Sequence, residues 1–192
     1  MRLRLLRGLL HQRLLLSRFR AGAGLRPRRI MRPQERSPVI IEKEEILKAL
    51  RAGPTILERL IRSLDDEVVR ARPAPGEWAI VEVVAHLADT EERALARTRA
   101  MLEEEEPALP AYDPAALAEE RNYIAMALGG EIERFRALRG EQARLLGSLT
   151  DGQWQRSGTH EEHGRITVQQ LAAHTAGEDA DHFVQIARLI PG

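Results

Sequence analysis

The chain of 192 residues contains no cysteine, which excludes disulfide bridges, thiolate metal ligands and a cysteine nucleophile. Leu, Ala, Glu and Arg dominate the composition and aromatic residues make up only 4%, which favours an all-α globular domain. The formal net charge of zero conceals an asymmetry, because residues 1–30 hold nine Arg and no acid and leave 20 basic and 29 acidic residues elsewhere. The acidic remainder argues against a nucleic-acid-binding protein.

Residues 1–38 form a basic extension and a polar linker, and residues 39–192 form the predicted folded domain. The extension has no apolar run near the roughly 18 residues of a transmembrane helix, so we expect no stable membrane insertion and a cytoplasmic protein. Its Leu and Arg content fits a membrane-surface helix or a transit-peptide-like segment as well as a disordered tail. We favour the disordered tail, and Met31 offers a second start.

Apolar residues at helical spacing predict two helices in the first half of the domain. The first covers about residues 43–64, with a kink or a break at Pro54, because proline removes a backbone donor and clashes with the preceding turn. Residues 65–77 are rich in proline and charge and are predicted as a loop. The second helix covers about residues 80–105 and carries His86 between apolar neighbours.

A third helical region follows a second proline-containing loop at residues 107–114. Asp113 is a good N-cap for it, with Pro114 at the first helical position. The region extends over about residues 114–149, and Gly129-Gly130 is expected to split it into a short and a longer helix.

The C-terminal part contains a long polar segment and a fourth helix. Residues 150–166 are polar and contain glycine, which predicts an irregular loop with room for a short hairpin. Thr167 is expected to cap a helix over about residues 168–189. Four amphipathic helices joined by loops bury their apolar stripes most simply as an all-α four-helix bundle.

Three residues of the last helix carry the clearest chemical signal. His174, Glu178 and His182 are four residues apart and therefore project from one helix face, a spacing used to hold divalent metals. His86 on the second helix can complete a His₂Glu set, as sites in bundles form from side chains on facing helices. From spacing alone the simpler alternative is a hydrogen-bonded core His86 beside a solvated Glu178 and His182.

Two stretches resemble the DinB-like (damage-inducible, YfiT-related) metal-binding four-helix bundles. The first runs Pro75-Gly-Glu-Trp78, then Glu82-Val-Val-Ala-His86-Leu-Ala-Asp89-Thr-Glu91, and is similar to the family pattern P-G-E-W-S followed by H-L-x-D-x-E. The second combines a loop over residues 158–164 and the helix start at Thr167 with Ala176-Gly-Glu-Asp-Ala-Asp-His182, where the family has roughly A-G-H-E-x-H-H. The resemblance spans about residues 43–190.

The resemblance implies a divalent ion held by one His of the second helix and two His, four apart, of the fourth. His86 and His182 fall on ligand positions, whereas Glu178 stands where the family usually has the other His. This difference leaves three alternatives. Glu178 binds the metal through its carboxylate, the site has lost its affinity for metal, or His174 binds the metal in place of Glu178. We prefer His86, Glu178 and His182 as ligands, and zinc or nickel as the metal.

The family also implies a metal-dependent enzyme, of the thiol-dependent transferase or hydrolase type, in which the metal activates a water or a thiol. The expected partners are a small-molecule substrate, a low-molecular-weight thiol and a second copy in a homodimer. No residue identifies the substrate or a catalytic group. The alternative is a non-catalytic, small-molecule-binding or stress-response bundle with a degraded metal site.

Some further residues are weaker candidates for the site. Trp78 is expected to cover the bundle end rather than to stack on substrate. Asp89 is either a partner near the ligands that holds a helix or loop in place or a surface acid. His160 and His163 lie in a loop that has the reach to approach the metal, and we favour the alternative that the loop is solvated.

Three more polar or aromatic residues complete the candidates. Trp154 is expected to pack under the long loop, and Asn122 and Tyr123 to line the pocket.

Overall fold

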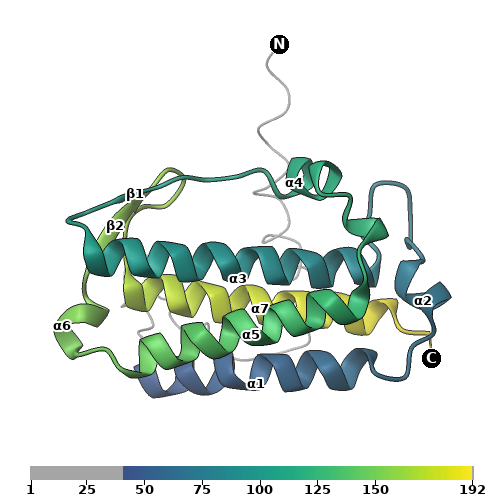
Figure 1. Cartoon of the computed structure of the whole chain (residues 1–192), viewed down its shortest axis with the longest axis horizontal. Helices are drawn as coiled ribbons and strands as arrows, with labels where there is room; N and C mark the ends of the chain where they lie inside the picture. The colour runs from purple at the N-terminus through teal and green to yellow at the C-terminus, as the bar shows by residue number, and fades with distance from the viewer. Residues whose placement is uncertain (1–40, 192) are drawn as a thin grey trace, which may run out of the picture. The chain divides into compact units, whose positions relative to one another are not determined.

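The computed structural model describes residues 41–191, and four long helices account for most of them (Figure 1). These are α1 (Lys43–Ile61), α3 (Ile80–Glu103), α5 (Leu128–Gly147) and α7 (Val168–Leu189). The predicted all-α four-helix bundle is therefore confirmed. Within the same residues, none of the helices combines the length and the apolar character that a membrane crossing requires. The extension and linker predicted for residues 1–38 lie outside the described residues.

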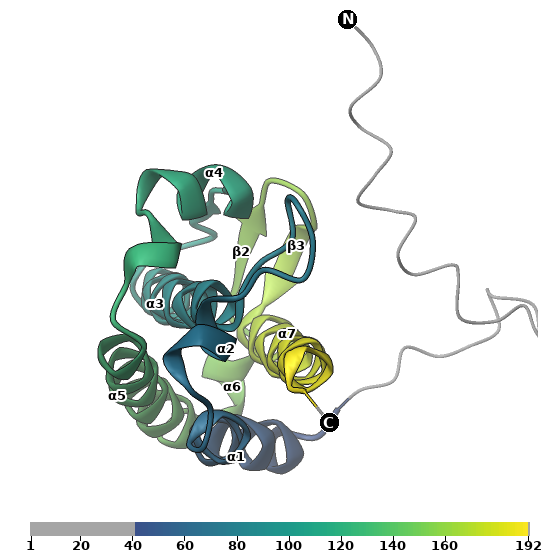
Figure 2. The ribbon, with the colours of Figure 1, turned by 90° about the vertical axis from the view of Figure 1, so that its right-hand side faces the viewer.

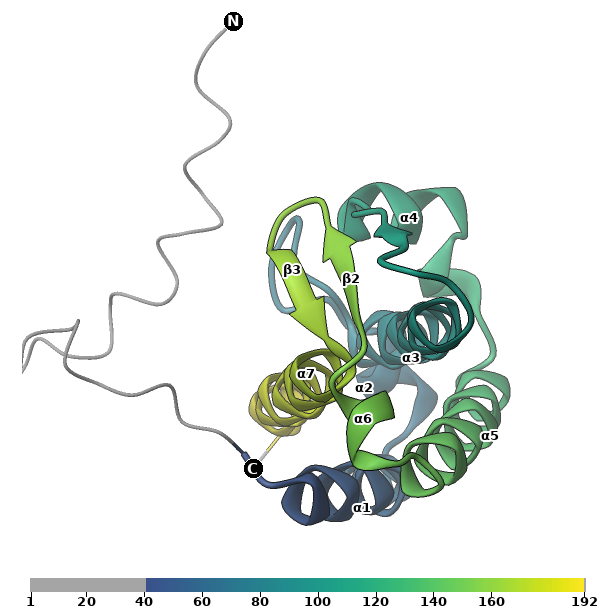
Figure 3. The same ribbon diagram turned by 90° about the vertical axis from the view of Figure 1, so that its left-hand side faces the viewer.

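The helices are not arranged around the bundle in chain order. Their order around it is α1, α5, α3, α7, so α1 and α3 occupy opposite corners (Figures 2 and 3). α1 and α7 run in one direction along the bundle, and α3 and α5 run in the other (Figure 1). This topology places α3, from the middle of the chain, directly beside the C-terminal α7.

The two helices that carry the candidate ligands begin at specific caps. At the start of α3, the Glu82 carboxylate accepts the backbone N–H of Ala79 at 2.9 Å and is itself held by Arg72 at 2.9 Å. At the start of α7, the Thr167 hydroxyl accepts the N–H of Gln170 at 3.2 Å. Both caps satisfy donors that a helix N-terminus leaves free, and the predicted starts at residues 80 and 168 are confirmed.

α1 continues through Pro54, so of the two predicted outcomes, a kink or a break, the break is wrong. Proline has no N–H to give to the carbonyl four residues earlier, which belongs to Leu50. That carbonyl instead accepts a hydrogen bond from Arg139 Nη1 of α5 at 3.1 Å. A side chain from a neighbouring helix thus replaces the backbone bond that proline removes.

Arg139 connects all four long helices at the centre of the bundle. Besides Leu50 on α1, its guanidinium donates to Glu91 of α3 at 2.7 Å and to Asp179 of α7 at 2.5 Å. We call Arg139, Glu91 and Asp179 the buried ion cluster, since their side chains are at most 7% exposed. The cluster lies between two apolar clusters, which include Leu57, Leu87, Phe135 and Ile186 on one side and Leu50, Met101, Leu146 and Leu171 on the other.

Gly53 allows the guanidinium to approach α1, because a Cβ at this position would lie 2.8 Å from Arg139 Nη1 and 3.2 Å from Asp179 Oδ2. We expect Gly53→Ala to lower the free energy of unfolding by about 1–3 kcal/mol, although alanine is the better helix former. Gly177→Ala is the control, because nothing lies within 4 Å of the added Cβ. Urea unfolding measures both, and a stabilised Gly53→Ala variant would contradict the close packing.

A short helix, α2 (Asp66–Arg70), lies where the sequence predicted a loop. Arg70 pairs with Asp66 one turn earlier at 2.9 Å, and it also donates to the carbonyl of Ile124, 54 residues further on, at 2.6 Å. The second contact comes from a distant part of the chain, so the local pattern does not reveal it.

The third helical region is interrupted at Asn122 and not at Gly129-Gly130, which lie in the first turn of α5. Before the interruption, α4 (Pro114–Glu120) starts as predicted, with the Asp113 carboxylate accepting two backbone N–H groups. Asn122 then adopts a left-handed conformation with φ of 51°, and the 3₁₀ turn η2 (Tyr123–Ala125) follows. The reversal directs the Tyr123 hydroxyl to Asp89 of α3, a tertiary contact that fixes where the helix ends.

Three short strands form a sheet beside α3 and α7 (Figures 2 and 3). β1 (Ala108–Leu109) pairs in parallel with β2 (Ser157–His160), which pairs antiparallel with β3 (Gly164–Thr167). The predicted hairpin is confirmed, and a short helix, α6 (Asp151–Trp154), precedes it. β1 falls in a predicted loop, because a two-residue strand has no periodicity to recognise.

Candidate metal centre

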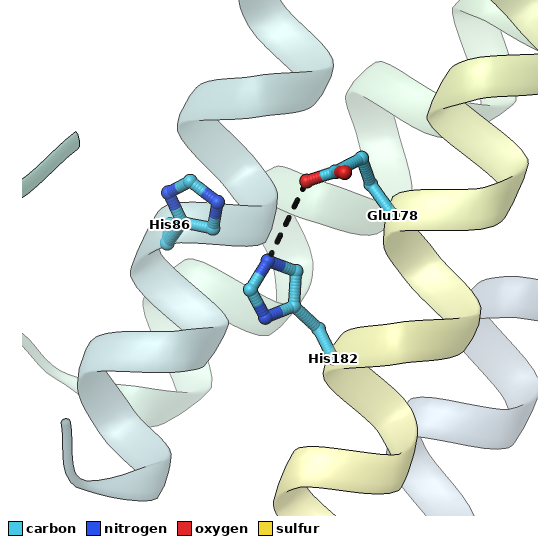
Figure 4. A group of neighbouring side chains, drawn as sticks. All are labelled: His86, Glu178 and His182. Carbon is cyan, nitrogen blue, oxygen red and sulfur yellow. Dashed lines mark ion pairs between the residues drawn. The ribbon is translucent and has the colours of Figure 1, made fainter. Parts of the chain in front are cut away.

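His86 of α3 and Glu178 and His182 of α7 point toward one another between the two helices (Figure 4). Each offers a ligand atom, and these atoms all lie within 4.8 Å of one another. The arrangement follows from the topology, which makes α3 and α7 neighbours, and from the four-residue step between Glu178 and His182. The structure therefore brings together the three residues that the sequence predicted as ligands.

His86 is buried, with 5% of its surface exposed, and its ring centroid lies 5.0 Å from that of Trp78 and 4.8 Å from that of His182. Burial lowers the pKa of His86 to about 4, and the neighbouring His182 makes a smaller contribution in the same direction. The negative charge of Asp89 acts to raise it. The imidazole is therefore neutral at pH 7, as a metal ligand must be. Its buried Nδ1 has no hydrogen-bond partner in the described chain, and its Nε2 lies 3.4 Å from the Thr90 hydroxyl.

His182 is held in one tautomer by its neighbour on α7. Its Nδ1 lies 2.9 Å from the amide oxygen of Gln185, and since that oxygen only accepts, Nδ1 carries the proton. The lone pair is then on Nε2, which faces Glu178 with 3.9 Å between Nε2 and Oε2 (Figure 4). A hydrogen bond that orients one ring nitrogen and leaves the other free is typical of metal-ligating histidines.

The burial of neutral His86 predicts a pH dependence for the stability of the metal-free protein. Its folded pKa of about 4 lies below the ordinary 6.5, so between these values the unfolded chain binds a proton that the folded chain does not. We expect about 3 kcal/mol of stability to be lost as the pH falls from 6.5 to 4. Urea unfolding in the presence of a chelator measures this loss, and His86→Gln should flatten the curve. Parallel curves for parent and variant would contradict the burial of neutral His86.

His174 does not join the three-residue group. Its side chain is 55% exposed, and its Nε2 lies 4.0 Å from Glu178 Oε1, so Glu178 stands between His174 and His182 on the helix. Its ring lies 5.5 Å from that of His163 in the β2–β3 hairpin. His174 therefore connects the α7 residues to the hairpin rather than to His86.

A second group of ligand-type residues, His160, Glu162 and His163, lies in the hairpin with ligand atoms within 4.8 Å of one another. It is the poorer cation site for two reasons. His160 Nδ1 already accepts the backbone N–H of Glu162 at 3.2 Å. Burial lowers the pKa of His160, and the next contribution comes from the positive charge of Arg97, which would also repel a metal ion.

Both groups line one cleft of about 410 Å³. Every histidine among residues 41–191 contributes to its wall, so the hairpin and the candidate metal centre share one cleft. The prediction of a purely solvated loop is wrong for His160, which is 6% exposed, whereas His163 is exposed.

Asp89 holds neighbouring segments in place, which was one of its two predicted roles, and the alternative of a surface acid is wrong. It is 2% exposed, and it binds the Tyr123 hydroxyl, Arg121 and Arg134, the last at 2.7 Å. Its role is to hold α3 to η2 and α5. The negative charge also opposes the lowering of the His86 pKa from a distance.

Two other predicted pocket residues lie outside this cleft. Tyr123 is fully buried behind Trp78, and Asn122 lines a separate cavity of about 350 Å³. Trp78 covers His86 and forms a wall of both cavities. Trp154 is buried in the apolar cluster beneath the hairpin segment, as predicted.

Three further cleft residues were not predicted, namely Thr90, Arg97 and Tyr112. Thr90 and Arg97 follow His86 by four and eleven residues on α3, so a helical projection from His86 identifies them. Tyr112 lies in the loop after β1, and its hydroxyl is 3.1 Å from that of Thr90. No local pattern in the sequence marks that contact.

The model of the DinB superfamily matches residues 49–186 of the chain. YfiT of Bacillus subtilis strain 168, a probable metal-dependent hydrolase, is 28% identical over 149 residues, which are 77% of this chain and 84% of YfiT. The YfiT structure, described as an unusual four-helix bundle, matches with a TM-score of 0.73 and covers 86% of this chain and 91% of its own.

Two more distant structures share the fold. The mycothiol-dependent maleylpyruvate isomerase matches with a TM-score of 0.64 at 14% identity, over 76% of this chain and 61% of the isomerase. The four-helix bundle protein TT2238 matches with a TM-score of 0.54 at 21% identity, over 77% of this chain and 99% of its own.

Proposed function

The chain belongs to the DinB superfamily, and on that basis we propose that it is a divalent-metal-dependent hydrolase. The metal would be held by His86, Glu178 and His182. The observation that carries the proposal is the buried, neutral His86 with an unpartnered ring nitrogen, facing two further ligand-type side chains. The likeness to YfiT, a probable metal-dependent hydrolase, supports the class of reaction.

The donor set fits zinc or nickel, because two imidazoles and one carboxylate are ligands that both ions accept. Three protein ligands leave a coordination position open, as in catalytic rather than structural zinc sites. Bound there, a divalent ion would supply Lewis acidity, which lowers the pKa of a coordinated water or thiol.

The protein's own residues would orient the ligands and a small-molecule substrate. Gln185 fixes the tautomer of His182, and Trp78 covers His86 and excludes water from it. The hydroxyls of Thr90 and Tyr112, 3.1 Å apart, line the cleft beside His86 and can donate hydrogen bonds to a substrate carbonyl.

The test is to measure the metal content of the purified chain, and then hydrolysis of ester and amide substrates before and after removal and return of the metal. We expect about one zinc or nickel per chain and hydrolysis that follows the metal content. A low-molecular-weight thiol is included as an alternative acceptor in parallel assays. Metal-dependent transfer to the thiol without hydrolysis would replace the hydrolase by a transferase.

The competing hypothesis is a non-catalytic bundle with a degraded site. It would be supported if the purified chain holds no metal and takes up neither zinc nor nickel on incubation. Metal uptake without turnover of any substrate would indicate a metal-dependent binding protein and would also contradict the hydrolase proposal.

A further inference from the structure

Arg97 differs from the other residues that line the cleft. Within the described chain it is the one Arg or Lys in the cleft wall, which otherwise combines histidines, apolar side chains, hydroxyls and the carboxylates of Glu162 and Glu178. It lies on α3, on the same face as His86 and Thr90. A single fixed positive charge in a concave wall is a recognition element for an anion.

The bonding of Arg97 leaves most of its donors available. Its Nη2 donates to the carbonyl of Pro110 at 2.5 Å, which fixes the guanidinium in the wall. No carboxylate among residues 41–191 lies within 4.0 Å of it, unlike the guanidinium of Arg99 on the opposite face of α3, which pairs with Glu141. Burial lowers the pKa of Arg97, so part of its hydration is already lost before any ligand arrives. A guanidinium has five N–H donors and holds an oxyanion best through two parallel bonds.

The position of Arg97 relative to the metal centre defines two ends of the cleft. Eleven residues of α-helix separate His86 from Arg97, which is about 16 Å between their Cα atoms. Between them α3 contributes Thr90 and Ala94 to the wall, and α7 contributes Leu171 and Thr175. The cleft therefore has a ligand-rich end and a cationic end, joined by a wall of mixed apolar and hydroxyl side chains.

We propose that Arg97 binds a carboxylate group at one end of the substrate, while the reacting group at the other end meets His86, Glu178 and His182. The inference rests on the proposed function for the identity of the reacting end, but not for the binding of the anion. A carboxylate fits better than a phosphate, because one guanidinium balances one negative charge and Glu162 and Glu178 in the same wall oppose a second.

Octanoate, octanamide and octyl phosphate test the proposal on the full chain by calorimetric titration, with and without added zinc. The three probes share an apolar chain and differ in the charge of the head group. We expect octanoate to bind about tenfold more tightly than octanamide in both conditions, as a charge-assisted hydrogen bond implies. Arg97→Gln should reduce that preference to less than about twofold, and Arg97→Lys, which retains the charge, should keep part of it.

Arg99→Gln is the matched control, because it removes the same charge from the same helix on the other face and should leave the preference unchanged. A preference that appears only with zinc and survives Arg97→Gln would place the carboxylate on the metal and overturn the role of Arg97. That result would leave the metal proposal standing. Equal binding of octanoate and octanamide, or tighter binding of octyl phosphate, would overturn the carboxylate specificity. Zinc binding is measured separately in the same series, so the metal proposal is tested independently.

Discussion

Replacement of Arg139 by methionine is expected to lower the free energy of unfolding by about 3–5 kcal/mol. The substitution keeps an unbranched, largely apolar stem but removes the guanidinium, which leaves Glu91 and Asp179 without their cation in the bundle interior. It also frees the Leu50 carbonyl, which Pro54 cannot satisfy. Burial already raises the pKa of Glu91, and without Arg139 this carboxyl is expected to take up a proton. Urea unfolding at pH 7 gives the loss directly.

Arg136→Met is the control, because Arg136 lies one turn earlier on α5 and forms exposed ion pairs with Glu58 and Glu133. Arg136→Met should lower the free energy of unfolding by no more than about 1 kcal/mol. Adding Glu91→Gln and Asp179→Asn to Arg139→Met should recover part of the stability by removing the uncompensated charges. Equal losses for the Arg139 and Arg136 variants would contradict the role of the buried ion cluster.

Removal of the His86 imidazole is expected to weaken zinc binding by more than a hundredfold. Loss of a residue that only orients a ligand weakens binding by about 10–100-fold, and a direct ligand contributes at least as much. His86→Ala and Glu178→Ala should therefore both abolish binding at micromolar zinc, whereas Gln185→Leu should weaken it by about 10–100-fold. Competition with a chromophoric chelator measures all three dissociation constants.

His174→Ala tests the alternative third ligand in the same experiment, and we expect it to leave zinc affinity unchanged because His174 is turned toward the hairpin. Strong binding by Glu178→Ala together with lost binding by His174→Ala would assign the third position to His174. His163→Ala is the control for the hairpin group. If it alone removed zinc, the metal would belong to the hairpin and the His86 site would be wrong.

The four long helices could be predicted because each one carries an apolar stripe over four or more turns, and caps such as Asp113 and Thr167 mark their starts. The errors have a common physical origin in distant contacts. Continuity through Pro54 depends on Arg139, α2 depends on the carbonyl of Ile124, and β1 depends on a partner strand about fifty residues away. None of these contacts has a local signature.

The residues of the candidate site likewise fall into those that the sequence could predict and those that distant contacts place. His86, Glu178 and His182 could be identified because helical spacing fixes which residues share a face and the family resemblance links the two helices. Thr90 and Arg97 were accessible to the same reasoning but carry no family motif. Tyr112 and His160 reach the cleft through a loop and a hairpin whose paths are set by tertiary pairing, so the sequence alone did not place them.

Glu178 and Asp179 are consecutive, and the second of them is held by Arg139 at 2.5 Å. Successive residues of an α-helix point about 100° apart, so fixing Asp179 toward the bundle axis also fixes the direction of Glu178 toward the cleft. Arg139 thereby sets the azimuth of α7, that is, its rotation about its own axis. A rotation of α7 by one residue would bring Asp179, with its shorter side chain, toward the cleft, and it would turn Glu178 out of the cleft and leave the guanidinium without a carboxylate from α7. The candidate metal centre thus depends on an angular constraint supplied by a residue that never enters it.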